Sequence, residues 1–212
     1  MENLHIRSQM INHQVNFCLE KLMNRCPWVK MSNPLYIRYH DEEWGFPVHD
    51  DQKHFEYLIL EGAQAGLSWE TVLNKREAYR RLFAKFDPKK VARFTPARIE
   101  KILKNPAIIR NRLKVNSAVT NARAFLQIQK EFGSFDRYVW DFVGGETIVK
   151  RPKSLKDYRP TSPESDRLSA DLKKRGFKFV GSTVIYAHLQ ATGLIDEHSV
   201  NCFRSSRKFR QS

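Results

Sequence analysis

Residues 105–118, NPAIIRNRLKVNSA, predict two helices joined by a tight break. The pair Asn105-Pro106 ends the first helix, because the residue before a proline is disfavoured in the helical conformation. Helical periodicity resumes near Ile109, and basic residues lie just past the turn. Backbone amides at such a turn can bind a phosphate, since the second helix presents free N–H groups and the positive end of its dipole there. The stretch therefore predicts helices around a phosphate-binding turn.

Helical patterns extend from this break in both directions, so the sequence predicts an all-α fold. Toward the N-terminus, Ser68 is an expected N-cap, and prolines follow Asp87 and Thr95 in the first-turn position that suits them. Toward the C-terminus, Gly133 is the expected end of the long helix. The expected helices cover 1–24, 52–65, 68–83, 99–103, 109–132, 134–143, 162–176 and 182–193, with a loop-rich run over 26–50 and a short strand over 147–149.

The charge balance favours a polyanionic partner, most simply nucleic acid. The 212 residues include 37 Lys and Arg against 23 Asp and Glu, a net charge of +14. The basic residues cluster at 110–114, 173–181 and 204–210. None of these clusters forms the basic amphipathic helix with a clean apolar face that a membrane-surface protein uses. A basic surface that only keeps the protein soluble is the alternative.

The sequence argues against a membrane-spanning or secreted protein. No apolar run approaches the roughly 18–20 residues that cross a bilayer, and the first residues lack the apolar core of a secretory signal. The three cysteines are too few for a disulfide framework and fit a reducing compartment. We therefore expect a cytoplasmic protein.

The stretch LIDEHSVNC, residues 194–202, places His198 and Cys202 four residues apart. On a helix this spacing puts both side chains on one face, as a metal site requires. A second pair, Cys26 and His40, bounds the segment CPWVKMSNPLYIRYH near the N-terminus. Zinc binds two cysteines and two histidines tetrahedrally with no open position, so the four residues predict a structural zinc that joins the two ends of the chain. By spacing alone, other histidines could replace one of these ligands: His49, His54 or His188.

Aromatic residues flank a single carboxylate in LILEGAQAGLSW, residues 58–69. Glu61 follows three apolar residues and precedes Gly62-Ala63, so it is either exposed on the outer face of the helix or buried facing a ligand. Rings around a buried anion form a receptor for a flat, cationic ring, through cation–π contacts of about 0.5–2 kcal/mol each and a charge-assisted hydrogen bond. Core packing is the alternative role of each ring. The rings concerned are Tyr36, Tyr39, Trp44 and Trp69.

Five longer stretches carry a family signal: CPWVKMSNPLYIRYHDEEWG (26–45), LEGAQAGLSWETVLNKRE (60–77), AIIRNRLK (107–114), KKRGFKFVGST (173–183) and EHSVNC (197–202). Together they closely resemble the constitutive bacterial 3-methyladenine-DNA glycosylase family (type I). The resemblance runs in order from Cys26 to about Cys202, and several of the motifs are too long to match by chance. It divides the chain into an N-terminal extension (1–25), a glycosylase domain (26–203) and a basic tail (204–212).

The resemblance implies a helix-hairpin-helix DNA glycosylase with a structural zinc joining its termini. It assigns the zinc ligands to Cys26, His40, His198 and Cys202. It assigns the base pocket to Glu61, Tyr36, Tyr39, Trp44 and Trp69. The family lacks the catalytic aspartate common to other helix-hairpin-helix glycosylases and has no Schiff-base lysine, so strand cleavage is left to other enzymes. This sequence departs from the family at the hairpin, where Pro106-Ala107 replaces a frequent glycine, and at Pro27.

The chemistry expected of such an enzyme is extraction and recognition of a damaged base. Alkylation at N3 makes adenine cationic and weakens its bond to deoxyribose, so no strong acid is needed. We expect Glu61 to be the catalytic carboxylate, accepting hydrogen bonds from the flipped base, and the sequence leaves open whether it also activates water. Neutral adenine gains less from the anion and the rings, so selectivity follows from a difference in binding. Leu67 is either a wedge that fills the gap left by the base or a core residue. Candidate phosphate contacts are Lys114, Lys173, Lys174 and Arg175.

The sequence thus predicts a monofunctional glycosylase for base-excision repair. It would hydrolyse the N-glycosidic bond of 3-methyladenine in double-stranded DNA, as a monomer, in a bacterial cytoplasm and associated with the nucleoid. Two other classes of protein fit parts of the sequence. A zinc-stapled nucleic-acid-binding module would bind DNA without releasing a base, and a basic protein-interaction domain would show no salt-sensitive DNA binding.

Overall fold

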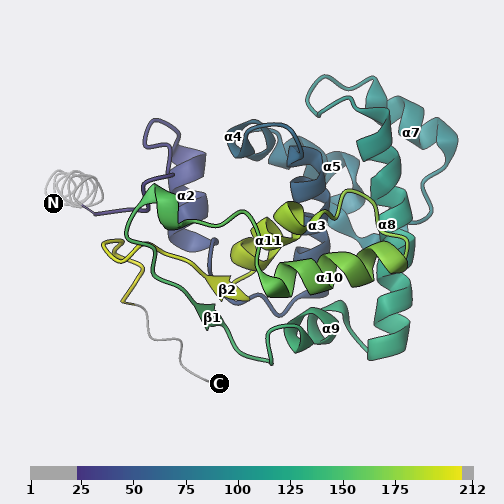
Figure 1. Cartoon of the computed structure of the whole chain (residues 1–212). Helices are drawn as coiled ribbons and strands as arrows, with labels where there is room; N and C mark the ends of the chain where they lie inside the picture. Colours follow the sequence, from purple (N-terminus) through teal and green to yellow (C-terminus); the bar gives the residue numbers. More distant parts are fainter. Residues whose placement is uncertain (1–22, 207–212) are drawn as a thin grey trace, which may run out of the picture.

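The computed structural model describes residues 23–206, which form a mostly helical fold with one small sheet within that range (Figure 1). Strands β1 and β2 pair in parallel through two residues each. The elements are α2 (Pro34–Glu42), α3 (Asp51–Gln64), α4 (Trp69–Leu73), α5 (Arg76–Leu82), η1 (Ala84–Phe86), α6 (Pro88–Val91), α7 (Pro96–Leu103), α8 (Arg112–Phe132), α9 (Phe135–Asp141), β1 (Ile148–Val149), η2 (Leu155–Asp157), α10 (Pro163–Lys174), α11 (Ser182–Ala191) and β2 (Ile195–Asp196).

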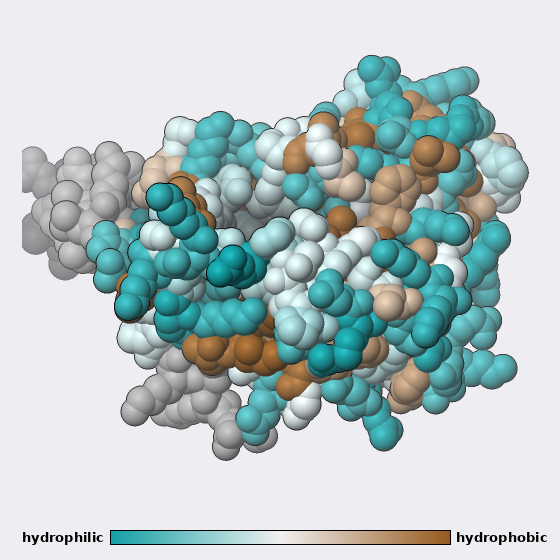
Figure 2. Space-filling model, in the orientation of Figure 1, coloured by the Kyte–Doolittle hydropathy of each residue, from teal (hydrophilic) through white to brown (hydrophobic). Residues whose placement is uncertain are grey.

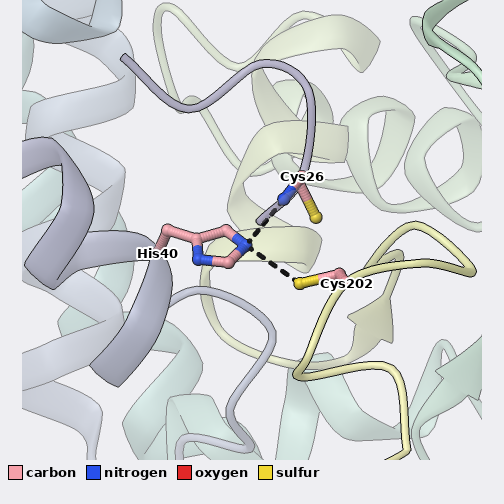
Figure 3. A group of neighbouring side chains, drawn as sticks. All are labelled: Cys26, His40 and Cys202. Carbon is pink, nitrogen blue, oxygen red and sulfur yellow. Dashed lines mark hydrogen bonds between the residues drawn. The ribbon is translucent and has the colours of Figure 1, made fainter. Parts of the chain in front are cut away.

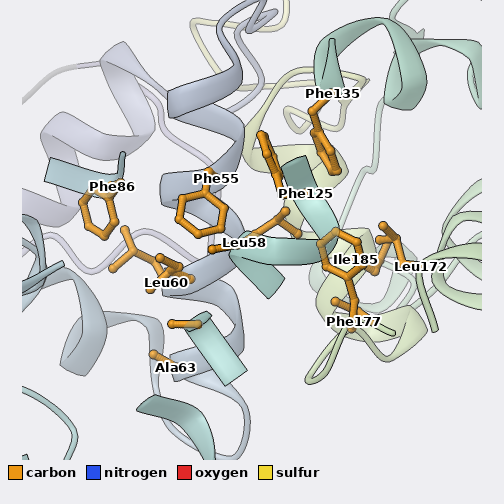
Figure 4. Packing of buried hydrophobic residues seen from close by; sticks show 14 of the residues in the cluster. Phe55, Leu58, Leu60, Ala63, Phe86, Phe125, Phe135, Leu172, Phe177 and Ile185 are labelled. Carbon is orange, nitrogen blue, oxygen red and sulfur yellow. The ribbon is translucent and has the colours of Figure 1, made fainter. Parts of the chain in front are cut away.

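Helix α3 lies at the centre of the fold, with residues 54–63 all buried. Helices α8 and α11 both pack against it. Aromatic rings fill the space between these elements: the Phe55 ring lies 5.2 Å from that of Phe125 on α8, which stacks at 4.2 Å on Phe135 of α9 (Figure 4). Each such ring buries a large apolar surface, worth about 1.5–3 kcal/mol. This packing fixes the position of α3, whose last two turns carry Glu61.

The break predicted at Asn105-Pro106 is present and is held by specific hydrogen bonds, but α8 begins at Arg112 rather than near Ile109 as predicted. The Asn105 side chain accepts from the Ala107 N–H at 2.9 Å, and the Tyr79 hydroxyl accepts from the Ile109 N–H at 3.3 Å. Asn111 caps α8 by accepting from the Lys114 N–H. The turn is therefore defined even though a proline and an alanine stand in it.

Local capping signals are confirmed along the chain. Ser68 accepts from the Thr71 N–H, and Gly133 ends α8 at φ +87°. Asp87, Thr95 and Ser162 each cap a helix whose first residue is a proline.

Four expectations are corrected. The run 26–50 contains α2, which begins at Pro34 because Asn33 caps its first N–H groups. The helix expected over 68–83 is two helices, broken at 74–75. The short strand expected over 147–149 is confirmed as β1, but its partner β2 was not predicted, so the mostly helical fold also has a small parallel sheet. Finally, the helical spacing considered for His198 and Cys202 does not apply, because LIDEHSVNC forms β2 and then a turn in which the Cys202 N–H donates to the Ser199 carbonyl at 2.8 Å.

The two ends of the described chain meet. The Phe203 N–H donates to the Asn24 carbonyl at 2.8 Å, and the segment after β2 runs beside α2 (Figure 1). The helix expected over 1–24 lies almost entirely outside the described residues, as do residues 207–212 of the basic tail. Within residues 23–206, no helix combines the length and the apolarity that a bilayer span requires.

Candidate active site

A cavity of about 330 Å³ opens between α2, α3, α11 and the segment that carries η2. It contains the carboxylate and all four aromatic residues that the sequence selected for the base pocket. Its volume fits a single planar heterocycle. The lining residues are Trp28, Tyr36, Tyr39, Trp44, Glu61, Gln64, Trp69, Leu155, Tyr158, Arg159, Ala187 and Gln190.

Glu61 is the only carboxylate among those lining residues, and it is 3% exposed. It has no hydrogen-bond partner in the part of the chain that the structure describes. Burial raises its pKa from 4.5 to about 8. A buried carboxyl without a cation beside it keeps its proton, and a cation entering the cavity would favour its ionisation. The side chain faces the cavity, so the outer-face alternative does not hold.

The aromatic rings form the walls around this carboxyl. Tyr39 and Trp69 have ring centroids 5.1 Å apart, and Trp28 lies edge-on to Trp44 at 4.6 Å. Burial raises the pKa values of Tyr36 and Tyr39, so both hydroxyls stay protonated as hydrogen-bond donors. The buried Trp69 Nε1–H has no partner among the described residues. Such a wall can stack on a flat ring and donate to its acceptors.

Several lining residues were not predicted from the sequence. Trp28 belongs to a quoted motif and could have been found as one more ring beside Tyr36. Ala187 and Gln190 lie three residues apart on α11, a spacing that places both on one face of a helix. The η2 segment contributes Leu155, Tyr158 and Arg159, and no local signal pointed to it.

The candidate metal centre brings Cys26, His40 and Cys202 together, with ligand atoms all within 4.8 Å of one another (Figure 3). The Cys202 Sγ lies 3.5 Å from His40 Nε2. A hydrogen bond from the Cys202 thiol lowers the pKa of Cys26 to about 4, which favours the thiolate that a metal binds. Asp41 Oδ1 lies 2.7 Å from His40 Nδ1 and orients the ring, so that Nε2 faces the two sulfur atoms.

His198, the fourth predicted ligand, lies beside this group. Its ring centroid is 5.1 Å from that of His40, and its Nδ1 lies 2.6 Å from Asp196 Oδ1. Its Nε2 is buried with no partner in the described chain. His198 is not one of the three residues whose ligand atoms lie within 4.8 Å of one another, but its orphaned nitrogen is buried on a ring that neighbours His40. Two thiols and two imidazoles form a donor set that zinc prefers, so the chemistry of the residues fits that metal. The alternative ligands lie elsewhere: His49 and His54 contact Asp136, and His188 contacts His54.

The candidate DNA contacts divide into two groups. Leu67 is 41% exposed and is therefore not a core residue. Its turn is held by the Gln64 side chain, which donates to the Leu67 carbonyl at 2.8 Å. Lys173 and Lys174 are exposed on the last turn of α10.

Lys114 and Arg175 are instead engaged within the protein. The Lys114 ammonium donates to the carbonyls of Ala63 and Ala65 at 2.8 and 2.6 Å, and so caps the C-terminal end of α3. Arg175 forms ion pairs with Glu131 and Asp171, each at 2.6 Å. These partners were not predicted from the sequence, and they occupy donors that a phosphate contact would use.

A mostly helical, basic chain with a base-sized aromatic cavity around a buried carboxyl has the features of a DNA glycosylase. Comparison with known proteins agrees: residues 28–205 match the methyladenine glycosylase family. DNA-3-methyladenine glycosylase 1 of Escherichia coli (strain K12) is 48% identical over 180 residues, which cover 85% of this chain and 96% of that protein. DNA-3-methyladenine glycosylase of Haemophilus influenzae is 46% identical over 181 residues, covering 85% and 97%. This chain belongs to the methyladenine glycosylase family, type I, so the predicted resemblance is confirmed.

Solved structures agree with the family assignment. A crystal structure of 3-methyladenine DNA glycosylase I superimposes with a TM-score of 0.82 at 48% identity, covering 85% of this chain and 98% of that one. The Staphylococcus aureus enzyme, studied for its recognition of 3-methyladenine, gives a TM-score of 0.84 at 36% identity, covering 88% and 99%.

Proposed function

We propose that this protein is a DNA-3-methyladenine glycosylase of base-excision repair. It hydrolyses the N-glycosidic bond of the flipped 3-methyladenine nucleotide and leaves the DNA strand intact. The observation that carries the proposal is Glu61, a carboxyl buried among aromatic rings and without a partner in the described chain. An unpaired buried carboxyl costs stability, and a ligand that pairs with it explains its presence.

The cavity favours an alkylated purine over a normal one for electrostatic reasons. A base methylated at N3 carries a positive charge until the glycosidic bond breaks. That charge would ionise Glu61 and gain a charge-assisted hydrogen bond together with cation–π contacts to the rings. Neutral adenine gains neither, so discrimination arises from the difference between the two binding energies.

Bond cleavage needs little further help. The cationic base is a good leaving group, and the carboxylate of Glu61 would stabilise the positive charge that spreads onto the sugar as the bond breaks. Water then attacks the sugar carbon. The residues that line the cavity include no lysine, so the site offers no amine for an imine intermediate, and strand cleavage does not follow.

Zinc would be held by Cys26, His40, His198 and Cys202. With four protein ligands and no open position it would supply stability rather than chemistry, joining the segment before α2 to the turn after β2. The domain division proposed from the sequence, an extension over 1–25, a domain over 26–203 and a tail over 204–212, places both ligand pairs at the edges of the domain.

DNA would bind across the mouth of the cavity. We propose that α7, the turn at 104–111 and α8 form a helix-hairpin-helix that binds a phosphate, that Leu67 fills the gap left by the base, and that Lys173 and Lys174 add phosphate contacts. Because Lys114 and Arg175 are paired within the protein, their part in DNA binding would be smaller. The protein would act as a monomer, with the nucleoid in a bacterial cytoplasm.

The test is release of free 3-methyladenine from methylated double-stranded DNA, followed by chromatography, together with a check for intact strands. Glu61→Gln serves as the matched control, because it keeps the shape and removes the charge. Salt-sensitive DNA binding without base release would instead support a zinc-stapled binding module, and absence of DNA binding would support a protein-interaction domain.

A further inference from the structure

A second polar group faces the cavity from α11. Gln190 lines the cavity with Ala187, one turn before it. Its side-chain Nε2 donates to Glu197 Oε2 at 2.5 Å. Its Oε1 has no hydrogen-bond partner within the described residues. The amide therefore offers the cavity an acceptor, provided that its orientation is fixed.

A directed chain of hydrogen bonds fixes that orientation. The Lys150 ammonium has only donors, and it donates to the Tyr186 hydroxyl oxygen at 3.1 Å. The Tyr186 O–H must then donate onward, and it does so to Glu197 Oε2 at 3.0 Å. Glu197 is 2% exposed and accepts from both Tyr186 and Gln190. The Gln190 nitrogen is the atom that donates to Glu197 Oε2, which also accepts from Tyr186, so the Gln190 oxygen points away from Glu197, toward the cavity.

We propose that Gln190, positioned by Glu197, reads the exocyclic group of the flipped base and makes the site select adenine over guanine among N3-methylated purines. This inference rests on the proposed function. In 3-methyladenine the substituent at C6 is an amine with two N–H donors, which two acceptors in the cavity, the Glu61 carboxylate and the Gln190 carbonyl, can satisfy. In 3-methylguanine the same position is a carbonyl oxygen, which meets the Gln190 oxygen with two acceptors opposed.

The experiment measures release of 3-methyladenine and 3-methylguanine from the same methylated DNA, so that the ratio of the two kcat/KM values is an internal control. Glu197→Met keeps a similar length but removes the oxygen that accepts from the Gln190 N–H. The Gln190 amide is then free to turn its amine toward the cavity, and the ratio should fall about tenfold, the effect of one buried hydrogen bond. Gln190→Leu removes the acceptor altogether and should lower the ratio to a similar extent.

Asp171→Asn is the matched control. Asp171 also accepts a tyrosine hydroxyl, that of Tyr138 at 2.7 Å, but it does not line the cavity. Its replacement should leave the ratio at the wild-type value, whatever it does to stability. Gln190→Leu lies on the cavity wall, so it tests the inference even if Glu197→Met unfolds.

The outcomes separate the two proposals. One outcome is that wild-type protein releases 3-methyladenine while the variants at residues 190 and 197 both keep the wild-type ratio within about twofold, well below the effect of a lost hydrogen bond. In that case the role of Gln190 is refuted and the proposed function stands. If folded wild-type protein releases neither base, the proposed function fails, and this inference fails with it.

Discussion

Replacing Glu61 by glutamine should raise the stability of the protein while lowering its activity. Burial raises the pKa of this carboxyl from 4.5 to about 8. Between these two pH values the folded protein holds a proton that the unfolded chain has released. The carboxyl therefore favours folding fully below pH 4.5, and its contribution is lost as the pH rises through 8.

The magnitude follows from the two pKa values. Their difference corresponds to a loss of about 5 kcal/mol of unfolding free energy above the folded pKa, because each unit is worth about 1.4 kcal/mol. The loss is about 3 kcal/mol at pH 7 and about 1 kcal/mol at pH 5. Glutamine has the same shape and does not titrate. The stability of Glu61→Gln relative to wild type should therefore improve by about 4 kcal/mol between pH 5 and pH 9.

The assay is urea unfolding of both proteins at pH 5, 7 and 9, combined with base release over the same range. Other titrating groups are common to the two proteins and cancel in the comparison. Wild-type kcat/KM should rise toward pH 8 as Glu61 ionises in the free enzyme. Glu61→Gln should lose about 10- to 100-fold in kcat/KM, the effect of a charge-assisted hydrogen bond. A stability difference that does not change with pH, or near-wild-type release by the glutamine variant, would refute the reasoning.

Further predictions concern the metal, the wedge and the DNA contacts. Elemental analysis should find about one zinc per chain, and Cys26→Ser or chelation should lower the melting temperature sharply; a metal-free protein of unchanged stability would exclude the zinc. Leu67→Ala should lower kcat/KM for duplex DNA. It should leave the melting temperature of the protein within a degree or two of the wild-type value, because the side chain is 41% exposed. Equal rates on duplex and single-stranded DNA in both proteins would argue against a wedge. Replacing Lys173 and Lys174 by glutamine should reduce the salt slope of DNA binding by about 2; an unchanged slope would remove them from the interface. Lys114→Met should cost about 1–2 kcal/mol in urea unfolding, because two carbonyls at the end of α3 lose their charged donor; no loss would show that water replaces it.

The sequence predicted most of the helices because their ends are set locally. A cap such as Ser68 or Thr95 acts on N–H groups two or three residues away, so its signal is complete within a short window. The short strand expected over 147–149 is present as β1, but its pairing of Ile148 with Ile195 has no such local signal. The pairing depends on a contact between segments almost fifty residues apart, and the two residues of β2 are too few to show a strand pattern.

The site was predictable to the extent that its residues carry distinctive chemistry. A carboxylate inside an apolar run stands out in any chain, and so do cysteine–histidine pairs in a chain with few cysteines. These signals selected Glu61 and the two pairs that contain Cys26 and Cys202. Gln190 does not stand out, because a glutamine at the end of an amphipathic helix is ordinary. Its significance lies in Glu197, which a turn and a strand bring back beside it. Long-range pairing of this kind is visible only in three dimensions.

The hydrogen bond between Asn24 and Phe203 has a consequence for how this chain can be engineered. Because the two ends of the described range, residues 23–206, adjoin, a short linker could join them, and new termini could be opened in an exposed loop without altering the packing. The loop at Gly144–Gly145, which is exposed and does not line the cavity, is a suitable place to cut. Such a circular permutant would retain both cysteine–histidine pairs in one continuous stretch of sequence.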